Sequence, residues 1–490
     1  MSQSAQLPEV FLAFGFHINT SHSYRIDTAD ERGFAKDIRI IRSILDTLDA
    51  ANQRGVAVRG VWDTEQLFSI EECLNVHAPD LLDRIRDRVG QGWDEVVYMS
   101  YNNGLVSAMN EHELSTVLSR SRSNSAGSGL EDVFGEVSPI VRPQEMMTTA
   151  GSFSHYRAHG IEAVCLYYSA TPFDAMRMFV DPLDATQAHN PLLFSLEGDD
   201  RGKSDESIRV IPTYHTVDLI EHVSLRHWVK ELRRAQRAGG IDRDVLLFIN
   251  FDADDQMWEG YDVPAPLRAL PNTGGLGEMI ASIEDLEYVH YTTLAEYLDT
   301  HPDAGKISFS QDTADGSWNG YASWSEKYSS QLFYSVVNDD REISAAVEII
   351  AGSLPPEVRQ KCRDTLRESF EQRLRLLSTT AYGLATPFVA PAREQACVDT
   401  VHRIYNAHEV VVSEIAKVLL DLPAYSSDSG GDVFVADIRN GEEKLVARLV
   451  YPGNVSEVED IGITAHVPEE IFEKIQSRNL HLECAAAPGG

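Results

Sequence analysis

The feature that most constrains this chain is a regular alternation of strand-like and helix-like segments over roughly its first 300 residues. Apolar runs typical of buried parallel strands lie at residues 9–16, 55–62, 95–101, 161–168, 245–251 and 287–291. Apolar residues recur with helical period at residues 34–48, 69–88, 219–237 and 293–300. This alternation predicts a parallel sheet with helical crossovers, and roughly six to eight units suit a closed barrel better than a small open sheet.

The pattern changes after residue 328, where long helical repeats replace the alternation. These repeats occupy residues 329–350, 355–379 and 393–420. Farther on, Asn440-Gly441 stands between two strand-like runs and predicts a hairpin. We therefore expect an α/β fold, in which a distorted (β/α)7-type barrel is followed by a helical bundle and a small C-terminal β module. The expected domains are residues 1–305 (barrel), 306–425 (active-site loop and helical domain) and 432–485 (β module).

The charge of the chain narrows the choice of partners. The formal net charge is −34, so phosphate-rich nucleic acid and anionic membrane surfaces would be repelled, whereas a neutral sugar would not. We expect no membrane span, because no apolar run is long enough. The start of the chain has no signal-type stretch, so we expect a cytoplasmic protein. Five scattered cysteines without a CxxC pair argue against a disulfide framework or a structural zinc site.

Active residues of parallel α/β barrels lie at the carboxyl ends of the strands, so we searched those positions. His17 follows the first strand, with Asn19 beside it on the same alternating face. His17 either binds a sugar hydroxyl or a metal, or it caps the core. Trp62 ends the second strand and is either a stacking platform for a sugar or a core aromatic.

Carboxylates follow two other apolar segments. Glu145 comes just after Ile140-Val141, between a proline and two methionines, where a merely solvated side chain would be unusual. The apolar strand at 245–251 runs into Asp252, Asp254 and Asp255. Partial burial beside other carboxylates would raise one pKa, as a general acid needs; a calcium site, a helix cap or a solvated turn are the alternatives. A pair of carboxylates on separate strand ends fits glycoside hydrolysis.

Aromatic residues interleaved with Gly, Ser and Asn follow the last barrel unit, at residues 315–324. Trp318 and Trp324 in this segment would make a poor core element but a good sugar platform, because aromatic faces cover the C–H groups of a pyranose. A loop that anchors the helical domain is the other interpretation.

Taken in order, these segments resemble glycoside hydrolase family 57, the α-glucan-acting amylases, branching enzymes and glucanotransferases. His17-Ile18-Asn19 stands where the family has His-Gln-Pro, and Gly316-Ser317-Trp318-Asn319 resembles its Gly-Ser-Trp-Gly segment. The resemblance implies that Glu145, in Pro143-Gln144-Glu145, is the nucleophile. It also implies that Asp252, in Phe251-Asp252-Ala253-Asp254 with Trp258 following, is the general acid/base. Spacing alone does not separate Asp252 from Asp254.

The expected function is therefore a retaining glycoside hydrolase or glucanotransferase acting on α-linked glucans or oligosaccharides. The expected sugar contacts are His17, Asn19, Trp62, Asp254, Trp258, Trp318 and Trp324. No cofactor or catalytic metal is expected, and a homo-oligomer is left open. The alternatives are a zinc-dependent α-mannosidase of family 38, a polysaccharide deacetylase and a degenerate carbohydrate-binding barrel. Asn19 replaces the zinc-binding aspartate of family 38, and an amide is a poorer zinc ligand.

Overall fold

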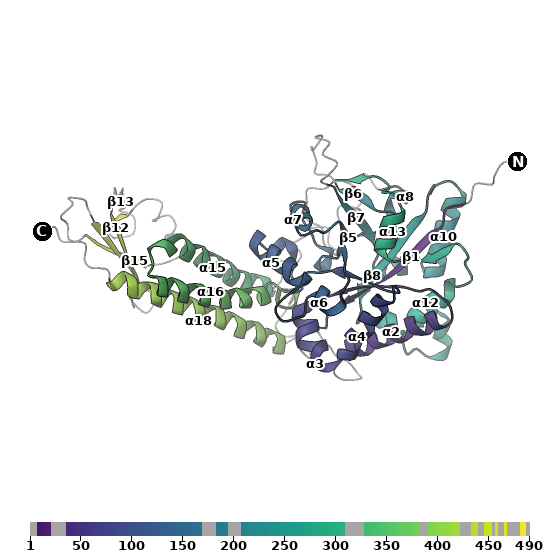
Figure 1. Cartoon of the computed structure of the whole chain (residues 1–490), viewed down its shortest axis with the longest axis horizontal. Coiled ribbons are helices and arrows are strands. Elements are labelled where there is room, and N and C mark those ends of the chain that lie inside the picture. The colour runs from purple at the N-terminus through teal and green to yellow at the C-terminus, as the bar shows by residue number, and fades with distance from the viewer. Residues whose placement is uncertain are drawn as a thin grey trace. The chain divides into compact units, whose positions relative to one another are not determined.

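The computed structural model describes two compact units, of which the first holds residues 1–332 and 377–396 and the second the rest of the chain (Figure 1). The residues described are 7–20, 36–168, 183–194, 207–308, 328–382, 391–421, 433–439, 445–452, 456–458, 465–467 and 481–486.

The first unit is built on a parallel sheet that curls until its ends meet. Its strands, in spatial order, are β1 (Val10–Ile18), β2 (Gly60–Thr64), β3 (Glu95–Tyr98), β4 (Ser138–Val141), β5 (Ala163–Tyr167), β7 (Ile208–Thr213) and β8 (Val245–Asp252). The strand β8 pairs with β1 along its whole length, from Val10↔Val245 to His17↔Asp252. Beyond β7, Tyr214 N–H donates to Phe248 O at 2.9 Å and Asn250 N–H donates to Tyr214 O at 2.9 Å. These bonds close a ring, which confirms the predicted barrel.

Three further strands decorate the ring. They are β6 (Leu192–Phe194), antiparallel to β7, β10 (Lys306–Ile307), parallel to β6, and β9 (Val289–Tyr291), which pairs with the first residues of β1. Sequence patterning missed β6 and β7. The run Ile208–Thr213 is short and contains Arg209 and Pro212, so it lacks the unbroken apolar pattern of a doubly covered strand.

Helices surround the sheet (Figure 1). They are α2 (Lys36–Gln53), η1 (Gln66–Leu74), α3 (Asn75–His77), α4 (Pro79–Gly90), η2 (Val106–Ala108), α5 (Glu111–Arg122), α6 (Leu130–Phe134), η3 (Gln144–Met146), α7 (Ser152–Ala158), α8 (Ala185–Ala188), α9 (Thr216–Glu221), α10 (Leu225–Arg237), α11 (Gln256–Glu259), η5 (Ala265–Ala269), α12 (Gly275–Ile283) and α13 (Leu294–Thr300). The helix predicted at 219–237 is two helices, because Val223 takes a positive φ of 66° and Ser224 then caps α10.

The barrel interior is filled by one apolar layer to which every strand of the ring contributes. Its strand residues include Ala13, Val61, Val97, Ile140, Cys165, Ile211 and Phe248, all of them buried. Because side chains of a strand alternate between its two faces, the residue two positions farther along each strand points to the same interior. The layer therefore fixes which residues reach the carboxyl-terminal mouth of the barrel.

The second unit contains three long helices, α15 (Tyr328–Ile350), α16 (Pro356–Leu376) and α18 (Pro391–Asp421), with η6 (Ala351–Ser353) between the first two. Val347, Cys362, Leu366 and Val411 form their shared apolar cluster. Beyond them, β11 (Val433–Arg439) pairs antiparallel with β12 (Leu445–Pro452) and β15 (His481–Ala486), and β13 (Ser456–Val458) pairs with β14 (Ala465–Val467). The antiparallel β11–β12 pair matches the predicted hairpin, whose Asn440-Gly441 turn lies outside the described residues.

Candidate active site at the barrel mouth

Polar side chains form the layer directly above the apolar core. Counting two positions on from the core residues leads to Asp63 on β2, Arg142 after β4, Tyr167 on β5, Thr213 on β7 and Asn250 on β8. On β1 the same face continues from Ala13 past Gly15 to His17, four positions on. All six are buried. Since a buried polar group must find a partner, this layer is expected to form one hydrogen-bonded network.

Asp63 is the centre of that network. His17 Nδ1 lies 2.6 Å from Asp63 Oδ2, and Asn250 Nδ2 donates to Asp63 Oδ1 at 2.8 Å. The Arg142 Nε atom is 3.5 Å from Asp63 Oδ2. The Asp63 side chain is fully buried, so its charge depends on these partners rather than on water.

Gly15 makes room for this arrangement. A Cβ atom at Gly15 would lie 2.4 Å from Asn250 Nδ2 and 2.7 Å from the Asn250 Cβ. Gly15 and Asn250 are register partners on β1 and β8, so the absence of a side chain on one strand admits the amide of the other.

Arg142 extends the network to the loop after β4. Its Nη1 donates to Pro143 O at 3.3 Å and to Gln144 Oε1 at 3.2 Å, and its Nη2 donates to the Tyr167 hydroxyl at 3.4 Å. Burial by itself lowers the pKa of the Arg142 guanidinium, but the surrounding acidic groups outweigh this effect and hold the pKa above its ordinary value. Glu145 and Asp252 are both among those groups, so the charges of both carboxylates favour the charged form of the same buried guanidinium.

Glu145 sits on a strained turn. Its φ is 56° and that of Met146 is 49°, a left-handed conformation that is costly for residues with large side chains. Gln144 Nε2 donates to Glu145 Oε1 at 3.0 Å, so Gln144 links the carboxylate to Arg142. Backbone strain of this kind tends to concentrate at functional positions, where the surrounding structure enforces it.

Asp252 ends β8 and is exposed, whereas the sequence suggested a buried carboxylate. The main chain at this point is held on both sides, because Ala253 N–H donates to His17 O at 2.7 Å and Trp258 Nε1 donates to Asp252 O at 3.0 Å. The raised pKa belongs to Asp255, through burial and the nearby charge of Asp252. Asp255 also caps α11, accepting from Met257 N–H at 2.8 Å, which is the helix-cap alternative noted above.

The two tryptophans proposed as sugar contacts near the strand ends are core residues instead. Trp62 is fully buried against Phe16, with ring centroids 4.7 Å apart, and its indole N–H donates to Asp94 at 2.8 Å. Trp258 is 1% exposed and stacks on Phe251 at 3.9 Å. Neither ring has a free face, so neither contacts a sugar. Trp318 and Trp324 lie outside the described residues, and Asn19 and Asp254 are half-buried beyond β1 and β8.

Only one of the two ring nitrogens of His17 has a hydrogen-bond partner among the described residues. While Nδ1 is bonded to Asp63, Nε2 is buried and has no hydrogen-bond partner among the described residues. An unpaired buried nitrogen costs free energy unless a ligand or water completes it. The position thus suits the sugar hydroxyl that the sequence suggested for this residue.

The segment that returns from the helices also reaches the mouth, which the sequence did not reveal. In α17 (Thr379–Tyr382), the Thr379 hydroxyl accepts from Gln144 Nε2 at 3.1 Å and from Asn103 Nδ2 at 2.9 Å. Asp63, Arg142, Tyr167 and Asn250 were likewise overlooked as site residues. The sequence did contain a signal for these four residues. A polar residue at the last inward position of an apolar strand, or directly after it, is unexpected unless it has a role.

A second buried carboxylate lies one residue beyond β2. Glu65 caps the π-helix η1, and its oxygens accept from Phe68 N–H at 2.8 Å and from Ser69 N–H at 2.6 Å. Burial raises the pKa of Glu65 to about 7, although these backbone bonds oppose the shift. π-helical turns are rare and often occur at functional sites.

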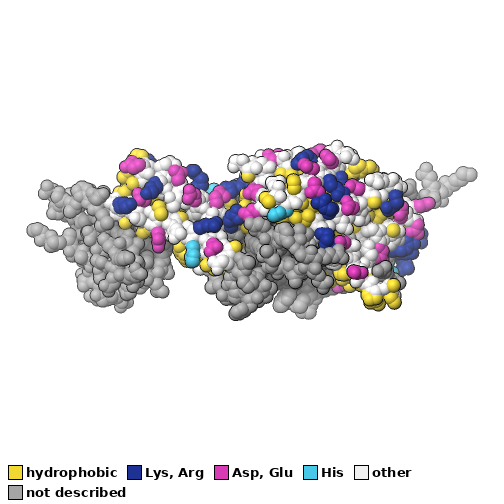
Figure 2. All heavy atoms as spheres, turned by 90° about the horizontal axis from the view of Figure 1, so that it is seen from below, with side chains coloured by type: hydrophobic (Ala, Val, Ile, Leu, Met, Phe, Trp, Pro, Cys, Tyr) yellow, Lys and Arg dark blue, Asp and Glu magenta, His cyan; other side chains and the backbone are white. Residues whose placement is uncertain are grey.

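Among the residues that the structure describes, no group of three or more His, Cys, Asp or Glu side chains is placed to hold a metal ion. No described helix has the length and apolarity needed to cross a membrane. Figure 2 shows acidic and basic side chains interleaved over the visible surface of the first unit, in a chain whose net charge is −34.

Comparison with known proteins gives matches at the level of structure. No family model and no curated protein matches the sequence. The family 57 branching enzyme of Pyrococcus horikoshii superposes with a TM-score of 0.55 at 10% identity, over 82% of this chain and 90% of that one. The corresponding enzyme of Thermococcus kodakaraensis gives 0.52 at 11% identity, over 85% and 92%.

The 4-α-glucanotransferase of Thermococcus litoralis gives a TM-score of 0.51 at 14% identity. The match covers 82% of this chain but only 60% of that enzyme's length. At sequence identities this low, the superpositions establish that the folds are shared and nothing further. The chain therefore has the fold of the glycoside hydrolase family 57 enzymes, in agreement with the resemblance found in its sequence.

Proposed function

We propose that the chain is a retaining glycoside hydrolase or glucanotransferase that acts on α-linked glucans or oligosaccharides, with Glu145 as nucleophile and Asp252 as general acid/base. The observation that carries the proposal is that both carboxylates adjoin the buried network at the barrel mouth: Gln144 links Glu145 to Arg142, and Asp252 is the register partner of His17, whose ring lies 2.6 Å from Asp63. The solved structures with this fold include enzymes titled 4-α-glucanotransferase and branching enzyme.

The order of the strands supports a site between the two carboxylates. Glu145 follows β4 and Asp252 ends β8; two strands of the ring, β5 and β7, separate them on one side and three, β1 to β3, on the other. The two carboxylates therefore rise from nearly opposite walls of the mouth. A sugar between them would present its anomeric carbon to one and its leaving oxygen to the other, which is the arrangement that glycoside hydrolysis requires.

The surroundings of each carboxylate fit its proposed role. Glu145 must be ionised to attack, and the chain of bonds from Arg142 through Gln144 stabilises its negative charge. Asp252 must exchange a proton with an outside molecule, and its exposure gives that molecule access.

In the first step a Glu145 oxygen bonds to the anomeric carbon while the glycosidic C–O bond breaks and Asp252 protonates the leaving oxygen. In the second step Asp252 takes a proton from water or from a sugar hydroxyl, whose oxygen attacks the same carbon and releases Glu145. Attack by water gives hydrolysis and attack by a sugar hydroxyl gives transfer. His17, Asn19, Asp254 and Trp318 are proposed to hold the sugar, with His17 Nε2 bonding a hydroxyl.

The test is activity on a panel of α-glucans and aryl α-glucosides, for the wild-type chain and for Glu145→Gln and Asp252→Asn. Both substitutions should reduce kcat by at least a thousandfold while glucan binding survives. Glu136→Gln and Asp242→Asn are matched controls on exposed carboxylates and should keep the wild-type rate. Wild-type rates in both site variants would refute the assignment.

The same panel separates the alternative functions. Activity on α-mannosides that a chelator removes would indicate a family 38 type of enzyme instead. Glucan binding without any turnover by the wild-type chain would indicate a carbohydrate-binding barrel.

A further inference from the structure

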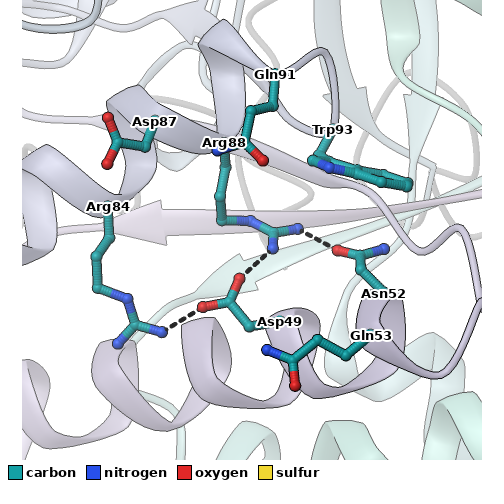
Figure 3. Close-up of a pocket in the computed structure, with 8 residues that line it drawn as sticks. All are labelled: Asp49, Asn52, Gln53, Arg84, Asp87, Arg88, Gln91 and Trp93. Carbon is teal, nitrogen blue, oxygen red and sulfur yellow. Dashed lines mark hydrogen bonds and ion pairs between the residues drawn. The ribbon is translucent and has the colours of Figure 1, made fainter.

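A polar pocket lies at the opposite end of the barrel from the mouth. It has a volume of about 390 Å³, within the range of roughly 300–1,000 Å³ that is usual for small-molecule sites. Gln53 at the end of α2, Gln91 after α4 and Trp93 before β3 line it, where the chain enters the amino ends of the strands. Figure 3 shows these side chains around a central arginine, Arg88.

The charges in the pocket are already matched to one another. Arg88 donates to Asp49 at 2.5 Å and to Asn52 Oδ1 at 3.0 Å, and its Nε donates to Asp94 at 2.7 Å. Arg84 donates to the other oxygen of Asp49 at 2.7 Å (Figure 3). Neither guanidinium is available to capture an anion, so a phosphate or an acidic ligand has no strong partner here. The pocket suits a neutral ligand.

The groups that remain available are those that recognise sugars. The side chains of Gln53, Asp87 and Gln91 form no hydrogen bond or ion pair with the residues that the structure describes. Their amides and carboxylate offer donors and acceptors to hydroxyl groups. Trp93 is half-buried and contributes an indole ring to the pocket wall, near Asn52 in Figure 3. An aromatic face beside uncommitted amides and a carboxylate fits a hydroxylated ring with apolar C–H faces.

We propose that this pocket binds a glucosyl segment of an α-linked glucan, separately from the reacting site. The choice of glucan rests on the proposed function. The catalytic carboxylates stand at the carboxyl ends of the strands and this pocket at their amino ends, so one long chain or branched particle is held at two places. Two linked contacts raise the apparent affinity for a polymer well above that for a short oligosaccharide.

The experiment is electrophoresis through native gels that contain glycogen, with Glu145→Gln as the parent so that the polymer is not consumed. Trp93→Ala in this parent should weaken retardation, raising the apparent dissociation constant at least threefold, and Trp93→Phe should restore part of it. Gln53→Ala combined with Gln91→Ala tests the pocket through two exposed residues, whose loss is not expected to affect folding. Tyr405→Ala, which removes an aromatic that is 43% exposed elsewhere, is the matched control and should migrate as the parent does.

Unchanged retardation of both pocket variants would overturn the proposal, and so would equal retardation of the parent by β-linked hydroxyethylcellulose. The outcome is separable from that of the proposed function. Wild-type turnover of α-glucans with retardation independent of Trp93 refutes only the pocket. Retardation that depends on Trp93, in a chain whose wild-type form turns over no glucan, refutes only the proposed reaction.

Discussion

Replacing Arg142 with methionine tests whether the buried network holds the barrel mouth together. The side chain is 3% exposed, and its loss would leave the fully buried Asp63 carboxylate without a cationic partner at 3.5 Å. Removing one member of a buried ion pair costs about 3–5 kcal/mol. Pro143 O and Gln144 Oε1 would lose donors as well, but these losses belong to the same network and do not simply add. We expect Arg142→Met to lower the free energy of unfolding by about 3–5 kcal/mol, a large part of the roughly 5–15 kcal/mol of a typical protein.

The assay is urea unfolding followed by tryptophan fluorescence and by circular dichroism, because a chain of this size need not unfold in one step. Arg42→Met is the matched control. It breaks an ion pair with Asp80 in which both side chains are 41% or more exposed, and it should cost less than about 1 kcal/mol. Replacing Arg142 and Asp63 together by methionine and leucine should recover part of the loss, because no unpaired charge is then buried. A loss below about 1 kcal/mol for Arg142→Met alone would refute the reasoning.

Three further predictions concern other parts of the molecule. The raised pKa of Glu65, about 7 in the folded state, means that its contribution to stability is present at low pH and is lost as the pH rises toward 7. The difference in unfolding free energy between wild type and Glu65→Gln should therefore fall by on the order of 2 kcal/mol from pH 5.5 to 8, and a flat difference would contradict the shift. Gly15→Ala should push Asn250 out of the network and reduce kcat at least tenfold, whereas wild-type kinetics would show that the mouth tolerates the displacement. In the helical unit, Asp340→Ala removes the buried ion pair that Asp340 forms with Arg373 at 2.8 Å; amide hydrogen exchange in α15, α16 and α18 should speed up, and unchanged protection would contradict that role.

The barrel could be predicted because its strands and helices are each recognisable from short stretches of the sequence. The strand β8 and the strand β1 are apolar almost throughout, as strands covered on both faces must be, and helical periodicity separates them. The number of units favoured closure but could not establish it, since closure depends on two backbone bonds at Tyr214 that no sequence pattern specifies. The strand β7 was missed because Arg209 and Pro212 interrupt its apolar pattern.

The site was predictable in part. Alternation along β2 places Asp63 inside the barrel and Trp62 outside it, and this register decides between core and site more reliably than residue type. The aromatic character of Trp62 drew attention away from its neighbour. Asp252 was singled out by family resemblance, while its exposure and the partial burial of Asp255 are seen only in the folded structure. Thr379 was beyond reach, because 276 residues separate it from Asn103 in the sequence.

That separation affects the order in which the protein can be completed during synthesis. Asn103 and Gln144 leave the ribosome long before Thr379, and α15 and α16 must be made in between. The seven strands can assemble earlier, since β8 ends at Asp252. The hydrogen bonds from Thr379 to the barrel mouth can form only later, and forming them carries the entropic cost of closing a long loop. Synthesis of α15 and α16 therefore delays completion of the candidate active site, which a nascent chain would reach only after the segment around Thr379 had been made.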